Sequence, residues 1–272
     1  MENQGKIMEN NEFEQDVNRK NLIRRERIGK ILGSGLMRTI AILLTIFVSI
    51  DLFAGFVNIT ACNGQVFFQS VSWIVLVITR FVPNIIACMA IWAIFKTAHN
   101  RHEINLLGFK ALRCVIAVMC AVIVIKLIGG ITMFLVNVNY VTPIDTLTKS
   151  STIILSIVIF AIVEVIQLIV YRFVFVSVHS VVKDENGENP MKNGKTTSVL
   201  LIVVGSLMVL NIVPIINITN EIVDAFDLRC VNVYQAVSFM YQNPISIILT
   251  GIIMIFAGIV ILLFNNRKQI EK

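Results

Sequence analysis

The chain lacks the short motifs that mark most autonomous enzymes. It has no Gly-x-x-x-x-Gly-Lys-Ser/Thr loop for nucleotide phosphates, no Gly-x-Ser-x-Gly nucleophile elbow and no Gly-x-Gly-x-x-Gly dinucleotide fingerprint. Histidine is scarce, with 3 residues, and no His-Glu-x-x-His pair is present. We therefore predict a protein that is not an enzyme, with no catalytic residue, no metal site and no cofactor.

A signal for export with cleavage is also missing. No Ala-x-Ala site follows the first apolar block, and the polar segment before that block is too long for a signal peptide. His99 and His102 fall in a basic stretch without a cysteine partner, so we interpret that stretch as solvated. Neither feature points to a secreted or metal-binding protein.

Apolar residues, by contrast, are abundant. They make up 56% of the 272 residues, against about 45–50% in soluble domains, and the mean hydropathy is +0.81. They gather in blocks that can each cross a hydrocarbon core of about 30 Å as a helix. The sequence thus predicts an all-α integral membrane protein, a bundle of six transmembrane helices. The expected spans are residues 39–59, 71–95, 114–136, 152–175, 199–216 and 245–264.

The segments outside the spans are short. Residues 1–38 are expected to form a cytoplasmic tail, disordered at first and then, over 19–30, a basic helix in the membrane interface. Residues 39–264 form the transmembrane domain, and 265–272 a cytoplasmic C-terminal tail. Before the last span, residues 220–241 carry an approximate helical stripe of apolar positions, which favours an amphipathic helix at the outer leaflet.

Basic residues indicate the orientation. Outside the spans, Lys149 and Arg229 stand alone on one side, while all other Lys and Arg lie in the two tails and the alternate loops. Cytoplasmic loops are enriched in Lys and Arg, so both termini are expected in the cytoplasm of a plasma membrane, which requires an even number of spans. The net charge of +6 is therefore a sign of topology and does not indicate nucleic-acid binding.

Four charged residues lie inside expected spans: Asp51, Arg80, Lys126 and Glu164. An unpaired charge at this depth costs at least about 2.5–3.5 kcal/mol, so such groups face the bundle interior and find partners. By depth, we predict two ion pairs, Asp51 with Arg80 and Lys126 with Glu164. Two interpretations stay open, because a buried pair can specify helix register or form part of a polar, proton-linked site.

Other polar residues extend these positions. Gln167 and Tyr171 follow Glu164 at helical spacing, and Asn84 follows Arg80 by one turn. Helix breaks near midplane charges are where transporters build substrate sites, so a polar cavity is a further hypothesis. The candidate breaks are Pro83, Gly129, Gly130 and Pro214.

Small residues on the last span favour close helix packing. Gly251, Ala257 and Gly258 form a face without bulky side chains. Among the 5 cysteines, Cys62 and Cys230 both fall in expected outer loops, so a disulfide between them is topologically allowed. The remaining cysteines lie within spans as small apolar fillers: Cys88, Cys114 and Cys120.

The order of elements is similar in layout to permeases of ATP-binding-cassette exporters, although no motif carries the likeness. It implies a transport subunit in the lipid bilayer, energised by a separate cytoplasmic ATPase. The stretch Lys96–Arg113, with Leu106, Leu107 and Phe109, would be the ATPase docking surface.

Two other functions stay open. One is a carrier driven by an ion gradient and built on the four intramembrane charges. The other is a non-transporting sensor, immunity or assembly factor whose charges are structural. The expected partners are the lipid bilayer, an ATPase subunit or a second copy in a homo-oligomer, and no nucleic acid. A water-filled path through the bundle would distinguish transport from the rest.

Overall fold

The computed structural model describes residues 26–61, 77–140, 146–183, 191–210 and 244–265. Throughout these ranges the chain is helical or in short turns, and none of them contains a strand. Several predictions fall elsewhere. Cys62, Cys230, Pro214 and the expected helix at 220–241 lie outside the described residues.

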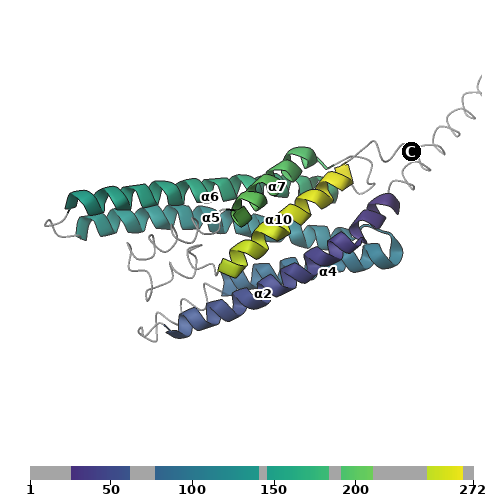
Figure 1. Ribbon diagram of the computed structural model, residues 1–272. Coiled ribbons are helices and arrows are strands. Elements are labelled where there is room, and N and C mark those ends of the chain that lie inside the picture. Colours follow the sequence, from purple (N-terminus) through teal and green to yellow (C-terminus); the bar gives the residue numbers. More distant parts are fainter. Residues whose placement is uncertain (1–25, 62–76, 141–145, 184–190, 211–243, 266–272) are drawn as a thin grey trace, which may run out of the picture.

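Figure 1 shows long helices that run along a common direction, joined in sequence order. Five of them, α2, α4, α5, α6 and α10, are long and apolar enough to cross a membrane. This confirms the all-helical class and fits a multi-pass membrane protein. The elements are α2 (Gly35–Ala61), the π-helical turn η1 (Val77–Phe81), α4 (Val82–Arg101), α5 (Leu106–Tyr140), α6 (Thr146–Lys183), α7 (Gly194–Leu210) and α10 (Pro244–Asn265).

The fifth expected span corresponds to α7. This helix has 17 described residues, which is about 25 Å of helix, and the expected span continues past Leu210 into residues outside the described part. The sixth membrane crossing therefore stays a prediction.

The surface of these helices is strongly apolar. Phe53 on α2, Met89 on α4 and Leu210 on α7 all expose most of their side chains. Soluble monomers rarely expose apolar surface on this scale in a continuous region. In a bilayer the same side chains would contact lipid tails. The exposed apolar surface therefore fits a protein whose helices lie in a membrane.

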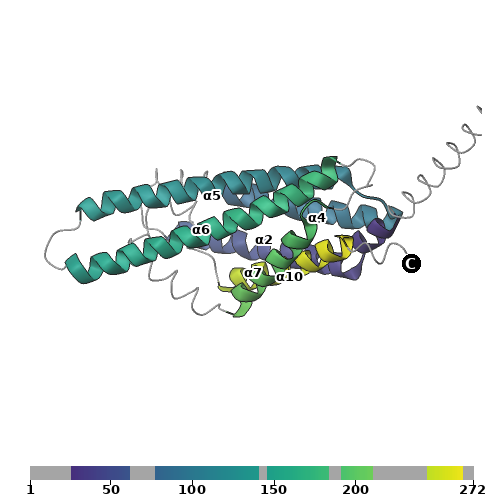
Figure 2. The same cartoon turned by 90° about the horizontal axis from the view of Figure 1, so that it is seen from above.

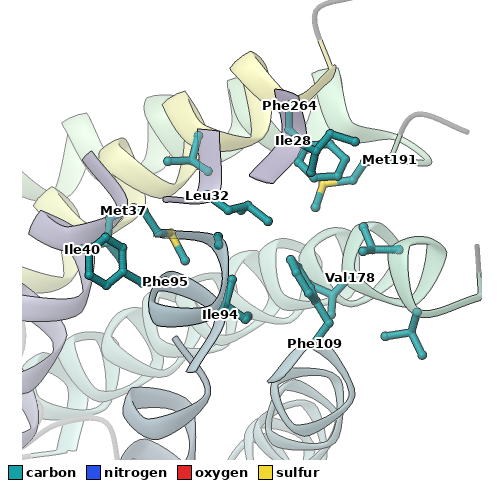
Figure 3. Packing of buried hydrophobic residues seen from close by; sticks show 14 of the residues in the cluster. Ile28, Leu32, Met37, Ile40, Ile94, Phe95, Phe109, Val178, Met191 and Phe264 are labelled. Carbon is teal, nitrogen blue, oxygen red and sulfur yellow. The ribbon is translucent and has the colours of Figure 1, made fainter. Parts of the chain in front are cut away.

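The buried apolar core lies at one end of the bundle, shown in close-up in Figure 3. This is the end where α2, α5 and α7 begin and where α4, α6 and α10 finish, and we call it the basic end because Lys30, Lys96, Lys110, Lys183 and Lys195 lie close to it in the chain. The core side chains are Ile28, Leu32, Met37, Ile40, Ile94, Phe95, Ala98, Phe109, Ile116, Val178, Val181, Val182, Met191, Val260 and Phe264.

This core joins the first and last long helices of the bundle. Met37 near the start of α2 and Phe264 near the end of α10 belong to the same cluster, so α2 begins where α10 ends. From this end α7 leads away and α10 returns. The arrangement agrees with an even number of passes, while the side of the membrane on which the basic end lies stays a prediction.

Helix α4 and helix α5 meet in a tight turn, His102–Asn105, where the sequence predicts a loop over Lys96–Arg113. His102 adopts a left-handed backbone (φ 54°) that ends α4. The Asn105 side chain accepts a hydrogen bond from the Gly108 N–H (2.9 Å) and donates one to Thr97 Oγ1 (2.9 Å). Asn105 accepts from a backbone N–H that has no partner within the first turn of the helix, and α5 begins at the next residue. The polar residues on both sides of the turn therefore belong to helices.

Helices α7 and α10 pack antiparallel at very short range, and they lie side by side in Figures 1 and 2. A Cβ atom on Gly251 would lie 2.8 Å from the Gly205 carbonyl oxygen, and one on Gly205 would lie 2.6 Å from that of Gly251. Further along, Ser198 Oγ donates to the Gly258 carbonyl (2.7 Å). The predicted small-residue face of the last span, with Gly251 and Gly258, is confirmed.

We expect Gly251→Ala to destabilise the protein by about 1–3 kcal/mol, because the new methyl group must push the α7 backbone away. Gly35→Ala is the matched control, since nothing lies within 4 Å of its added Cβ. Thermal unfolding in mild detergent, followed by circular dichroism, compares the two variants. Equal midpoints for both variants would show that the α7–α10 contact is not close-packed.

Candidate functional site

Two acidic side chains are buried inside the bundle. Asp51 on α2 is 1% exposed and Glu164 on α6 is 0% exposed. Burying an ionised carboxylate without compensation costs several kcal/mol in a membrane interior, so each position requires a polar environment. The sequence predicts both residues as interior groups on the grounds of their charge alone.

The Asp51 carboxylate receives a hydrogen bond from the neighbouring span. Asn84 Nδ2 on α4 donates to Asp51 Oδ2 over 3.3 Å, and Asn84 is half-buried. The sequence singles out Asn84 as a companion of Arg80, and the structure brings it to Asp51. The side chain of Arg80 lies outside the part of the molecule that the structure describes, so its pairing with Asp51 stays a prediction.

The backbone beside this contact is irregular. The π-helical turn Val77–Phe81 precedes α4, and Pro83 is the second residue of α4. Proline has no N–H to bond the carbonyl of Thr79 four residues earlier, and its ring displaces that carbonyl. Such wide turns occur often at functional sites in helices. The irregular backbone lies within one or two turns of Asn84.

A second hydrogen bond between α2 and α4 was not foreseen from sequence. Trp92 Nε1 donates to Thr45 Oγ1 (3.0 Å), and the Thr45 hydroxyl donates to the Ala41 carbonyl (2.8 Å). Cys88 Sγ is also 3.4 Å from the same hydroxyl. A threonine inside an apolar span is a weak signal by itself, because it can always bond its own helix.

The register of α5 and α6 shows which part of α5 faces Glu164. Arg113 Nη1 lies 3.3 Å from His179 Nδ1, which sets the approximate register of these antiparallel helices. Counting the same number of residues inward from each reaches Ile128 and Glu164. Lys126 is two residues from Ile128, so it lies on the part of α5 that faces the Glu164 turn of α6, to within the length of the Arg113 side chain. The Lys126 side chain is outside the described part, and the ion pair stays a prediction.

The other candidates on these helices have different outcomes. Gln167 and Tyr171 are half-buried on α6, and Tyr171 packs against the apolar core. Helix α5 continues through Gly129 and Gly130, so the break expected there is absent from the backbone. Glycine weakens a helix by only about 1 kcal/mol, which the flanking turns can offset.

The expected docking stretch divides into two kinds of surface. Phe109 is 4% exposed and points into the core in Figure 3, so the sequence was wrong to place it on the docking surface. Leu107, by contrast, is 78% exposed at the start of α5, and Leu106 is half-buried. The helical turn explains the difference, since adjacent residues in a helix point in directions about 100° apart.

The N-terminal basic segment packs on the same turn. Residues 26–32 are helical, and the earlier part of the expected 19–30 helix lies outside the described residues. A Cβ atom on Gly29 or Gly33 would strike the backbone of His102 or Ala98, and His99 Nδ1 lies 3.2 Å from the Gly33 carbonyl. Lys30 also bonds Glu26 (3.0 Å), which holds the pKa of that carboxyl below its ordinary value.

The remaining candidates are the cysteines and any group of metal ligands. Cys88, Cys114 and Cys120 are free thiols, and the Cys62–Cys230 bond stays a prediction. Among the described residues no three His, Cys, Asp or Glu side chains gather as metal ligands would. No family model, curated protein or solved structure matches the chain.

Exchanging the charges of Asp51 and Arg80 tests their predicted pairing. We expect Asp51→Arg and Arg80→Asp each to lower the yield of folded protein, because each leaves like charges in the bundle interior. The double exchange should restore much of the yield, measured as monodisperse protein on gel filtration. A double variant that folds no better than either single variant would contradict the predicted ion pair. The hydrogen bond from Asn84 would then remain as a polar contact of Asp51.

Proposed function

We propose that the chain is the membrane-embedded subunit of a transporter, with six spans and both termini in the cytoplasm of a plasma membrane. A separate ATPase or an ion gradient would energise it. The proposal depends chiefly on the burial of Asp51 and Glu164 inside apolar helices. Membrane proteins keep buried acids mainly where they line an ion or substrate path or pair with other charges.

The surroundings of Asp51 support this proposal. Its carboxylate and the Asn84 amide join α2 to α4 beside the π-helical turn. A transport site needs polar groups and irregular backbone at the same depth, because regular helices satisfy their own carbonyls. These features come together around Asp51.

The basic end supports an ATP-driven version. Asn105 caps the α4–α5 turn, and the N-terminal segment packs against it, with Gly29 next to His102 in the turn and Gly33 next to Ala98 in α4. That segment continues into α2 through the bend at Gly33 and Ser34. A partner that pushes on the exposed Leu107 would thus move α2 and α4 together, and these helices carry Asp51 and Asn84. The chain itself has no nucleotide motif, so the ATPase would be a separate subunit.

A non-transporting scaffold is the second candidate. Two hydrogen bonds across one helix pair, Asn84 to Asp51 and Trp92 to Thr45, are what a structural latch requires. Buried polar contacts can specify which helices pair without any transport role. A sensor, immunity or assembly factor would need this latch and no water path.

Cysteine accessibility separates these two functions. In a variant without the native cysteines, Glu164→Cys and Asp51→Cys should react with a charged, membrane-impermeant methanethiosulfonate. The reagent requires a thiolate, which forms in water and not in hydrocarbon. Ile162→Cys, on the exposed lipid-facing side of α6, is the matched control. Labelling of both buried sites no faster than the control would favour the scaffold.

Affinity purification in mild detergent tests the energy source. We expect a stoichiometric ATPase to remain bound to the tagged protein and to be lost on Leu107→Glu, because a charge would replace the exposed apolar contact. Lys195→Ala, another exposed residue at the basic end, should retain the partner. Recovery of the chain alone, or only with further copies of itself, would exclude the ATP-driven version and favour an ion gradient.

A further inference from the structure

The lipid-facing side of α6 runs directly into basic residues. Val158, Val165, Arg172 and His179 follow one another at a spacing of seven residues and are all exposed. Seven residues complete almost two helical turns, so these side chains lie on one face of the helix. Lys183 continues the face by one more turn. The apolar half of this face lies toward the bilayer interior and the basic half toward the basic end.

Helix α5 contributes to the same place. Arg113 Nη1 lies 3.3 Å from His179 Nδ1, and exposed Lys110 precedes Arg113 by one turn. The His179 ring is held in place by stacking on Phe175, with ring centroids 5.9 Å apart and planes 5° apart. Guanidinium groups only donate hydrogen bonds, so Nδ1 accepts and the Nε2 proton remains available to another group.

The cluster is rich in donors and poor in acceptors. Among the described residues, no carboxylate lies within salt-bridge distance of Lys110, Arg113 or Arg172. Lys183 is followed in the sequence by Asp184 and Glu185, so it adds the least positive charge. Two basic side chains held in contact, with further cations beside them, form an arrangement that an oxyanion stabilises.

We propose that this surface, the α5–α6 headgroup site, binds the phosphate of an anionic phospholipid in the leaflet at the basic end. Arg113, His179 and Lys110 contact the phosphate. Arg172 lies about 10 Å deeper and extends its long side chain toward the headgroup. The acyl chains lie along Val165 and Val158.

The apolar stripe selects a lipid over a dissolved anion. A free phosphate would use only the donors, whereas a phospholipid also covers the exposed valines that lead away from them. Basic pockets between membrane helices at the cytoplasmic side recognise anionic headgroups by this combination of charge and apolar contact. The inference needs only the membrane location of the helices and does not depend on transport.

Native mass spectrometry of the delipidated full-length protein in detergent tests the site. The protein is titrated with phosphatidylglycerol, with phosphatidylcholine of the same chains, and with a short-chain phosphatidylglycerol. We expect preferential binding of the long-chain anionic lipid. Arg113→Gln and Arg172→Gln should each weaken it about fivefold. Lys195→Gln, which removes an exposed charge at the same end of the bundle, should leave it unchanged.

Several results would overturn the proposal. Equal binding of both headgroups would mean that the basic residues do not select an anionic lipid. An equal loss in Lys195→Gln and Arg113→Gln would mean that these residues act only as general basic charge. Full competition by inorganic phosphate, with no preference for long chains, would make the ligand a soluble anion. If Arg113→Gln fails to fold, Arg172→Gln still decides the outcome, and Arg113→Lys should retain most of the binding because it keeps the charge.

Discussion

Lipid tails give membrane helices no hydrophobic reason to associate, so a bundle depends on close packing and on hydrogen bonds between helices. In the part of this protein that the structure describes, glycines allow helix backbones to approach closely. Gly205 and Gly251 allow the backbones of α7 and α10 to touch, and Gly29 and Gly33 do the same for the N-terminal segment and the α4–α5 turn. Dispersion contacts and carbonyl hydrogen bonds replace the missing hydrophobic force along these lines of contact.

The apolar core at the basic end extends this logic. Near water, burial of Ile28, Ile94 and Phe109 again lowers the free energy by removing apolar surface from solvent. The helix ends are therefore held firmly there, while the interior of the bundle carries the buried acids. Because the packed basic end is joined to α2 and α4, it is physically connected to the helices that carry Asp51 and Asn84.

Sequence reasoning found the buried acids but missed two polar contacts elsewhere in the bundle. Asp51 and Glu164 stand out because charges in apolar runs are costly, and both are buried. Thr45 and Trp92 were missed, since each residue has an ordinary interpretation alone and becomes informative only when α2 and α4 place them 3.0 Å apart. The same applies to Arg113 and His179, which are 66 residues apart in the sequence and meet only because α5 and α6 pack together.

By itself the sequence determined the all-helical membrane class and the approximate positions of the five helices long enough to cross a membrane, because hydrophobicity and spacing along one helix are local properties. Only the tertiary structure decided that Lys96–Arg113 is a capped helical turn, that Phe109 faces the core and that α5 continues through Gly129 and Gly130. Each of these depends on what a neighbouring helix covers. A single chain's pattern shows which side chains require a partner, and the packing of the helices determines which partner each one meets.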